Sequence, residues 1–227
     1  MSNHAQALDM LFELIYLPGA SGNTQFWHPV MQALQVKADS RVIAYPGFAD
    51  QPSHTQVNGF EDLQRYVIAQ MIPSMPPTLK PTEAVAQKRI IVAQSMGGIF
   101  AVQTALQHPT QVDGLVLVAT SGGIDLSNFE VLDWRQSYLK DLDVPDWFAI
   151  TQTNGVAEAL PEITCPVLLI WGDADPISPV AVGQYLQQQF VQAELNIIAG
   201  GEHNLANVHA DQVSVLISDF LEKLLLK

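Results

Sequence analysis

Short apolar runs alternate with longer amphipathic stretches along this chain. The short runs are rich in isoleucine, valine and leucine and mostly lack alternating polar residues, which is typical of strands buried on both faces of a parallel sheet. Six runs fit this description, at residues 11–17, 41–45, 89–93, 115–119, 167–171 and 195–199. We therefore predict a parallel sheet of about six strands.

The stretches between these runs carry apolar residues at three- and four-residue spacing. The pattern is clearest over residues 60–71, 99–106 and 213–224, where it gives each predicted helix one apolar stripe for packing on a sheet. Strands separated by helices form right-handed crossover units. The predicted fold class is therefore α/β, a doubly wound parallel sheet in a single domain over residues 1–227.

One segment, residues 122–161, interrupts this alternation because it contains no clear buried strand. It combines many acidic residues with five aromatic ones, Phe129, Trp134, Tyr138, Trp147 and Phe148. The aromatic residues indicate that the segment packs against the rest of the domain. We predict a small, mostly helical cap inserted between two strands, with a long connecting loop as the alternative.

The sharpest local motif is AQSMGG at residues 93–98, which follows a predicted strand directly and opens a predicted helix. This context places Ser95 at the kind of tight strand-to-helix turn that presents a serine nucleophile in G-x-S-x-G motifs. Such a turn needs small flanking residues; Gly97 supplies one, and Ala93 stands where glycine is usual. Ser95 is the candidate nucleophile, and a plain helix N-cap is the alternative.

A carboxylate and a histidine follow later strands, in the order serine, acid, histidine that this kind of site uses. The loop after the strand at residues 167–171 contains Asp173 and Asp175, and carboxyl ends of parallel strands are where α/β sites lie. Both aspartates are candidates at this point. After the last strand, two glycines precede His203 and allow a sharp turn that directs it inward as the general base.

The first predicted strand runs into a loop of small residues, PGASGNT at residues 18–24. A loop of this kind can direct a backbone N–H toward the site. We expect the N–H of Ala20, together with that of Met96 at the start of the helix after Ser95, to bind an oxyanion. The alternative is a simple tight turn.

Five segments together resemble the α/β-hydrolase superfamily of esterases, lipases and peptidases: LPGASGNTQFW, RVIAYPGFADQP, VAQSMGGIFAVQTALQHP, PVLLIWGDADPISP and GGEHNLA. The acid of a G-x-x-D turn is the last residue in that family, which implies Asp175 as the acid and leaves Asp173 a turn residue. The resemblance also implies the strand order 2-1-3-4-5-6. The family's N-terminal β-hairpin is not expected, since about ten residues precede the first strand, and Pro18 stands where histidine is common.

Composition narrows the possible partners. Ten lysines and arginines against twenty-three acidic residues give a formal net charge of −13, which repels phosphate backbones and anionic headgroups. We expect no nucleic-acid partner and no membrane partner. An acyl chain bound to an acidic carrier protein stays an alternative substrate, which the charge disfavours. The single cysteine, Cys165, excludes an internal disulfide and fits the cytoplasm. The N-terminus does not read as a signal peptide.

The function predicted from these residues is hydrolysis of a small, apolar carboxylic ester through an acyl-serine intermediate. Trp134, Trp147 and Phe148 of the cap are the candidate substrate-pocket residues. No H-E-x-x-H run, CxxC pair or G-x-G-x-x-G after a strand occurs, so we predict no metal and no cofactor. The oligomeric state stays open.

Two alternatives accompany this prediction. The same three residues can cleave a carbon–carbon bond, a thioester or an N-terminal peptide bond, because fold alone does not decide the substrate. From a different class, the fold can serve as a ligand receptor without turnover. Measuring steady-state hydrolysis separates an enzyme from a receptor.

Overall fold

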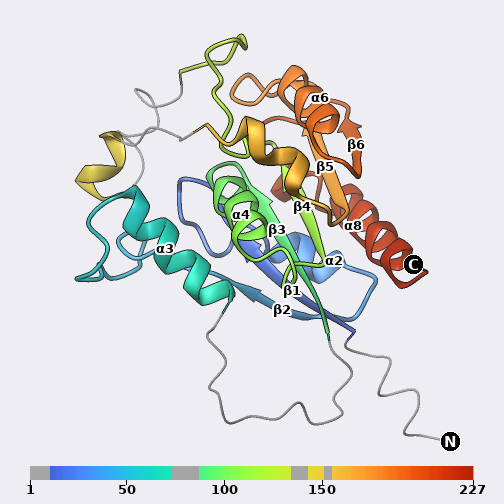
Figure 1. Cartoon of the computed structure of the whole chain (residues 1–227), viewed down its shortest axis with the longest axis horizontal. Helices are drawn as coiled ribbons and strands as arrows, with labels where there is room; N and C mark the ends of the chain where they lie inside the picture. Colours follow the sequence, from blue (N-terminus) through green and yellow to red (C-terminus); the bar gives the residue numbers. More distant parts are fainter. Residues whose placement is uncertain (1–10, 73–86, 134–142, 151–154, 227) are drawn as a thin grey trace, which may run out of the picture.

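A six-stranded, fully parallel sheet organises the molecule (Figure 1). The computed structural model describes residues 11–72, 87–133, 143–150 and 155–226. The strands are β1 (Phe12–Leu17), β2 (Asp39–Val42), β3 (Lys88–Gln94), β4 (Gly114–Val118), β5 (Val167–Gly172) and β6 (Ala193–Ile198). Their order across the sheet is β2-β1-β3-β4-β5-β6, which confirms the predicted order.

The edge strand β2 begins two residues earlier and ends three residues earlier than its hydrophobic run predicted. It pairs with β1 from Asp39 opposite Glu13 to Val42 opposite Tyr16. The next residue still donates its N–H to the Tyr16 carbonyl, at 2.9 Å, but the chain then leaves the sheet. Tyr45 is fully buried beyond the strand, so this run is apolar for core packing and not only for strand pairing.

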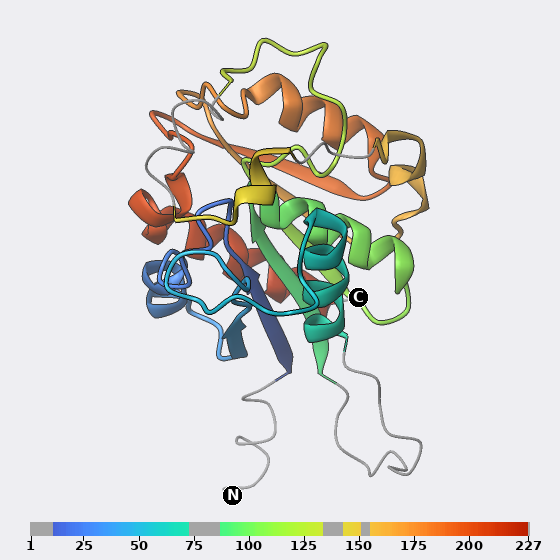
Figure 2. The same ribbon diagram turned by 90° about the vertical axis from the view of Figure 1, so that its left-hand side faces the viewer.

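Helices cover both faces of the sheet, as a doubly wound fold requires. They are α2 (His28–Ala33), α3 (Phe60–Met71), α4 (Met96–Gln107), α6 (Val180–Gln189), α7 (Leu205–Val208) and α8 (Ala210–Leu225). One core cluster contains buried residues of α3, α4 and α6, and the other contains buried residues of α2, α7 and α8. Figure 2 shows α3 and α4 on one side of the sheet and α2 on the other.

The central strand β3 illustrates how the sequence fills both cores. Successive side chains of a strand point to opposite faces. Ile91 and Ala93 accordingly belong to the core beneath α3 and α4, whereas Ile90 and Val92 belong to the core beneath α2 and α8. The apolar run predicted for this strand is therefore two interleaved rows, one for each face.

The described part of residues 122–161 contains two short 3₁₀ helices, η1 (Asp146–Ile150) and η2 (Ala157–Glu162). Residues 134–142 and 151–154 lie outside the described residues, so a mostly helical cap stays a prediction. The described residues on either side of 134–142 contact the domain. The N–H of Leu132 donates to the carbonyl of Pro176, at 2.8 Å, and the N–H of Ala49 donates to the carbonyl of Asp143, also at 2.8 Å.

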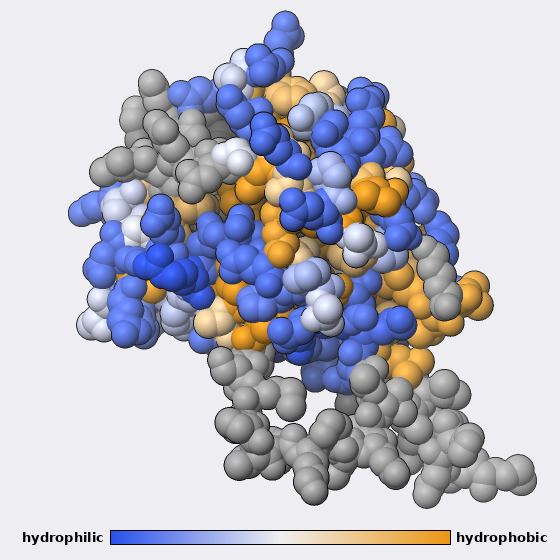
Figure 3. Space-filling view, in the orientation of Figure 1, coloured by the Kyte–Doolittle hydropathy of each residue, from blue (hydrophilic) through white to orange (hydrophobic). Residues whose placement is uncertain are grey.

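The face of the molecule seen in Figure 1 is mainly hydrophilic (Figure 3), with hydrophobic side chains gathered where α8 ends. Leu225 and Leu226 are exposed at that end of the helix. Within the described residues, no helix combines the length and apolar character that crossing a bilayer needs.

Candidate active site

Ser95 occupies a sharp turn between β3 and α4, at the carboxyl end of the central strand. Its backbone angles, φ 52° and ψ −120°, lie in a region that non-glycine residues seldom adopt. The neighbouring strand holds this conformation: the N–H of Ser95 donates to the carbonyl of Val118, at 3.0 Å. The hydroxyl of buried Thr120 also donates to the Ser95 carbonyl, at 2.5 Å. Strain of this kind persists only where surrounding contacts fix it.

The two glycines after Met96 allow α4 to begin this close to the sheet. A Cβ atom on Gly97 would lie 2.7 Å from the carbonyl oxygen of Pro18 and 2.8 Å from that of Leu17. A Cβ atom on Gly98 would collide with the side chain of Thr120. The double glycine of the motif is therefore a packing requirement of the turn that presents Ser95.

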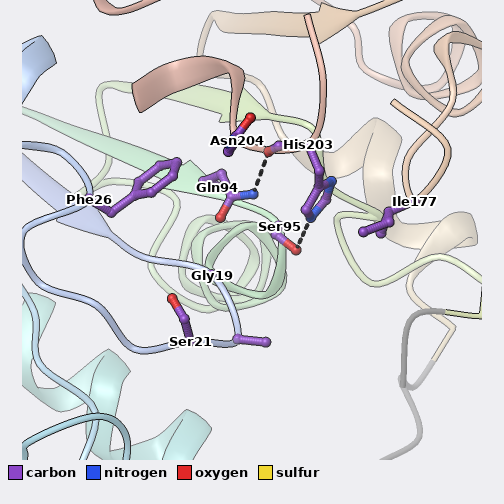
Figure 4. Close-up of a pocket in the computed structure, with 9 residues that line it drawn as sticks. Gly19, Ser21, Phe26, Gln94, Ser95, Ile177, His203 and Asn204 are labelled. Carbon is purple, nitrogen blue, oxygen red and sulfur yellow. Dashed lines mark hydrogen bonds between the residues drawn. The ribbon is translucent and has the colours of Figure 1, made fainter. Parts of the chain in front are cut away.

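His203 lies between Ser95 and Asp175 and contacts both through its ring nitrogens. Its Nε2 atom is 2.9 Å from Ser95 Oγ, and its Nδ1 atom is 2.8 Å from Asp175 Oδ2. Figure 4 shows the imidazole directed at the serine hydroxyl. The structure thus brings together the three residues selected from the sequence, although Ser95 and His203 are 108 positions apart.

Asp175 is the buried member of this group, with a fully inaccessible side chain. Oδ2 faces His203, and Oδ1 accepts the N–H groups of Ile177, at 2.8 Å, and Ser178, at 3.0 Å. A buried carboxylate needs such donors in place of water. They fix the carboxylate plane, and the remaining oxygen is left to orient the imidazole.

Asp173, the other candidate acid, is exposed and has a different partner. Its Oδ1 atom accepts the N–H of Gly200, at 2.6 Å. Its own N–H donates to the carbonyl of Ile198, at 3.3 Å. Asp173 therefore ties the loop after β5 to the loop after β6, in agreement with the turn role predicted for it.

The loop after β1 passes beside Ser95 and contains the proposed oxyanion donor. A hydrogen bond of 3.0 Å from the N–H of Gly22 to the carbonyl of Gly19 closes a turn around Ala20, and Gly22 has φ 63°. Met96 is the first residue of α4, and first-turn N–H groups have no acceptor within their own helix. The pairing of Ala20 and Met96 as oxyanion donors stays a prediction.

Two buried side chains donate hydrogen bonds to the backbone where this loop begins. The hydroxyl of Tyr45 donates to the carbonyl of Pro18, at 2.8 Å, and the indole of Trp27 donates to the carbonyl of Leu17, at 3.0 Å. Burial raises the pKa of Tyr45 well above its ordinary value, so the phenol keeps its proton and its hydrogen bond even at alkaline pH. Neither residue was singled out from the sequence.

A cavity of about 170 Å³ opens at Ser95 (Figure 4). It is lined by Gly19, Ala20, Ser21, Phe26, Gln94, Ser95, Ile177, His203 and Asn204. Ala20, Ser95 and His203 were selected from the sequence, whereas the other six were not: Gly19, Ser21, Phe26, Gln94, Ile177 and Asn204. Each lies within a few residues of a motif that was recognised, so proximity to those motifs was the available signal.

The aromatic residues predicted to line the pocket lie elsewhere or outside the described residues. Trp134 lies outside them. Trp147 and Phe148 pack edge-on against Phe48, with ring centroids 5.8 and 5.2 Å away. Neither is among the residues that line the cavity at Ser95. Their role in substrate selection stays a prediction.

Comparison with known proteins agrees with this geometry. A family model described as the alpha/beta hydrolase fold matches residues 14–143, more than half of the chain. The chain belongs to the α/β-hydrolase family. The match includes β1, β2, β3 and β4 and the turn at Ser95, while Asp175 and His203 lie beyond its end.

Curated relatives of this α/β-hydrolase are distant. "Serine hydrolase BPHL" of Mus musculus is 25% identical over 157 residues, which cover 58% of this chain and 54% of the mouse protein. The chain thus spans about half the length of that relative. A pimeloyl-[acyl-carrier protein] methyl ester esterase of Yersinia enterocolitica is 22% identical over 256 residues, which cover 93% of this chain and 93% of the esterase.

Solved structures show the same fold at lower identity. MenH from S. aureus superposes with a TM-score of 0.74 at 16% identity, over 95% of each chain. A putative lipase from Acinetobacter baumannii superposes with a TM-score of 0.73 at 19% identity, over 94% of this chain and 84% of the lipase. At these identities the likeness concerns the fold alone.

Proposed function

We propose that this α/β-hydrolase is a serine esterase that cleaves a small carboxylic ester through an acyl-serine intermediate. The observation that carries the proposal is the continuous hydrogen-bonded arrangement of Ser95, His203 and Asp175 around a strained serine at the end of β3. A serine, an imidazole and a buried carboxylate in this order activate the hydroxyl as a nucleophile.

Each residue has a defined part in the proposed reaction. Ser95 Oγ attacks the ester carbonyl carbon while His203 Nε2 takes its proton, and Asp175 stabilises the resulting imidazolium. The carbonyl oxygen becomes an oxyanion held by the N–H groups of Ala20 and Met96. The carbon–oxygen bond to the alcohol then breaks, and His203 gives its proton to the departing alkoxide. A water molecule then attacks the carbonyl carbon of the acyl-serine while His203 takes its proton. The bond to Ser95 Oγ breaks, His203 returns the proton to Oγ, and the carboxylic acid is released.

The size of the cavity supports a small substrate group. Its volume of about 170 Å³ is close to the roughly 150 Å³ that holds one benzene molecule in an engineered protein cavity. Phe26 and Ile177 give part of the wall an apolar character. We infer that the part of the ester accommodated here is small. The name of the Yersinia relative specifies a methyl ester, so the alcohol part of that protein's substrate is small, while its acyl part is bound to an acyl-carrier protein.

The partners and the compartment follow from composition. The net charge of −13 supports a free small-molecule ester over an ester carried by another acidic protein, because like charges repel at an interface. The single cysteine supports the reducing cytoplasm.

The test is turnover of p-nitrophenyl esters of increasing acyl length by the wild type and by Ser95→Ala. We expect hydrolysis that is fastest with short acyl chains and that disappears in Ser95→Ala. The matched control is Ser53→Ala, which makes the same chemical change at an exposed position and should keep wild-type rates. A wild type that hydrolyses no ester and takes no label at Ser95 from a fluorophosphonate would contradict the esterase and favour a ligand receptor.

A further inference from the structure

Gln94 is a buried amide in a row of apolar side chains. It is the last residue of β3, and the alternation along the strand puts it on the face of Ile90 and Val92, toward α2 and α8. The residue is only 5% exposed. A buried amide without partners costs folding free energy, so its presence at this position calls for a reason other than core packing.

The side chain of Gln94 lies between two loops that each contribute to the site. Its Nε2 atom donates to the backbone carbonyl of His203, at 3.1 Å (Figure 4). The other end of the amide lies against Gly19, so closely that a Cβ atom added to Gly19 would collide with Gln94 Oε1. One side chain therefore contacts the histidine loop and the loop with the oxyanion donor.

The backbone at His203 has a particular need for such a contact. Ser95 and Asp175 hold the imidazole ring of His203. These two contacts do not fix the backbone of His203, whose position depends on the loop between β6 and α7. That loop contains Gly200 with φ 70° and then Gly201, and glycine adds conformational freedom. The bond from Gln94 anchors the loop at the residue whose ring must be placed.

We propose that Gln94 is a positioning residue that fixes the distance between the His203 loop and the Gly19–Ala20 loop, and so between the general base and the oxyanion donors. The inference rests on the proposed esterase function. Gln94 is bonded to Ser95 in the chain, donates to the His203 carbonyl and packs against Gly19. One residue therefore contacts the nucleophile, the base and the oxyanion loop. Misplacement of reacting groups by about 1 Å can cost on the order of 100-fold in rate.

The first test compares Gln94→Met with the wild type in the rate of Ser95 phosphonylation by two fluorophosphonates, one small and one long-chained. Methionine keeps the length of glutamine but cannot donate to the His203 carbonyl. We expect the rate to fall about 10- to 100-fold, by the same factor for both probes. Gln107→Met, the same change at an exposed position of α4, should react like the wild type.

The second test uses Gln94→Glu, whose new carboxyl can donate to the His203 carbonyl only while it is protonated. Its phosphonylation rate relative to the wild type should fall as the pH rises through the pKa of that carboxyl. The corresponding ratio for Gln94→Met should not depend on pH. A residue that serves packing alone would give Gln94→Glu and Gln94→Met the same rate at low pH, where the carboxyl is protonated, because restoring the donor would then bring no gain.

The outcomes separate the two proposals. A wild type that takes no label overturns the esterase function and the inference that rests on it. A labelled wild type with Gln94→Met at the wild-type rate overturns the inference alone. Rates that fall by different factors for the two probes would make Gln94 a substrate contact and would also overturn it. Equal losses for both probes in Gln94→Met, with a faster rate for Gln94→Glu than for Gln94→Met at low pH, support the positioning role.

Discussion

Asp175 Oδ2 and His203 Nδ1 lie 2.8 Å apart although the residues are 28 positions apart in the chain. They meet because β5 and β6 are parallel neighbours whose carboxyl ends share one edge of the sheet. The loops after the two strands are also joined directly: the N–H of Ala174 donates to the carbonyl of Gly201, at 3.0 Å. The contact between Asp175 and His203 therefore depends on hydrogen bonds between the two loops as well as on the two side chains.

The first prediction concerns the two aspartates of the β5 loop. Asp175→Asn keeps an oxygen for the N–H groups of Ile177 and Ser178, but presents an amide to His203 and favours the wrong imidazole tautomer. We expect kcat for ester hydrolysis to fall on the order of 10⁴-fold with little loss of stability. Asp173→Asn is the matched control and should retain activity. A larger loss of kcat in Asp173→Asn than in Asp175→Asn would identify Asp173 as the acid.

The second prediction concerns the contact between the β5 and β6 loops at Gly172. A Cβ atom there would collide with the backbone of Gly201, and a backbone neighbour cannot rotate away. We expect Gly172→Ala to lower the free energy of unfolding by about 1–3 kcal/mol and to reduce kcat by shifting the His203 loop. Urea denaturation and ester hydrolysis measure the two effects.

The control for this substitution is Gly59→Ala. A Cβ atom added to Gly59 would meet no other atom within 4 Å, and the backbone there is extended at φ −174°, which any residue adopts. Gly59 precedes α3 as the N-cap, where alanine costs about 1 kcal/mol or less relative to glycine. Wild-type kcat is expected. Equal activity in Gly172→Ala and Gly59→Ala would show that the loop contact does not place His203.

The meeting of Ser95, Asp175 and His203 was predictable from the sequence because each of them follows an apolar strand. Strand order and chain order then bring Ser95, Asp175 and His203 to one edge of the sheet. The local pattern left Asp173 and Asp175 equally open, and the choice of Asp175 came from the resemblance to the α/β-hydrolase superfamily. For Ser95 and His203 the information was local, since it lay within a few residues of a strand's end.

Gln94 and the cavity wall were not predictable by the same reasoning. The side chain of Gln94 acquires its role from Gly19 and His203, which approach it from distant parts of the chain. Trp147 and Phe148 show a second limit of prediction from the sequence. Their aromatic character correctly predicted packing on the domain, but the partner they found is Phe48. Contacts between loops depend on three-dimensional placement that residue patterns do not contain.

The third prediction distinguishes the cavity wall from the aromatic residues of the insertion. Ile177 lines the cavity and is partly exposed, so Ile177→Ala should enlarge it and move the preference among p-nitrophenyl esters toward longer acyl chains. Phe148 is 7% exposed and packs on Phe48. We expect Phe148→Ala to cost about 3–5 kcal/mol of stability. A changed acyl preference in Phe148→Ala and an unchanged one in Ile177→Ala would show that residues of the insertion, and not Ile177, determine the acyl preference.

The last prediction concerns Cys165, which lies just before β5 and packs against the core beneath α4. Burial raises the pKa of its thiol from 9.0 to about 11, with the charge of Asp113 adding to the effect. At pH 8 about one thiol in a thousand is then ionised, against about one in ten at the ordinary pKa, and only the thiolate is reactive. Iodoacetamide should therefore alkylate the folded protein about 100-fold more slowly than the urea-unfolded protein.

The same shift fixes the sign of a pH effect on stability. The unfolded chain releases the thiol proton near pH 9, whereas the folded chain retains it until about pH 11. The contribution of Cys165 to stability is therefore complete below pH 9 and is lost as the pH rises toward 11. Urea denaturation at pH 8 and pH 10 should show a smaller pH-dependent loss in Cys165→Ala than in the wild type. Equal losses in the two proteins, or rapid alkylation of the folded wild type at pH 8, would contradict the raised pKa.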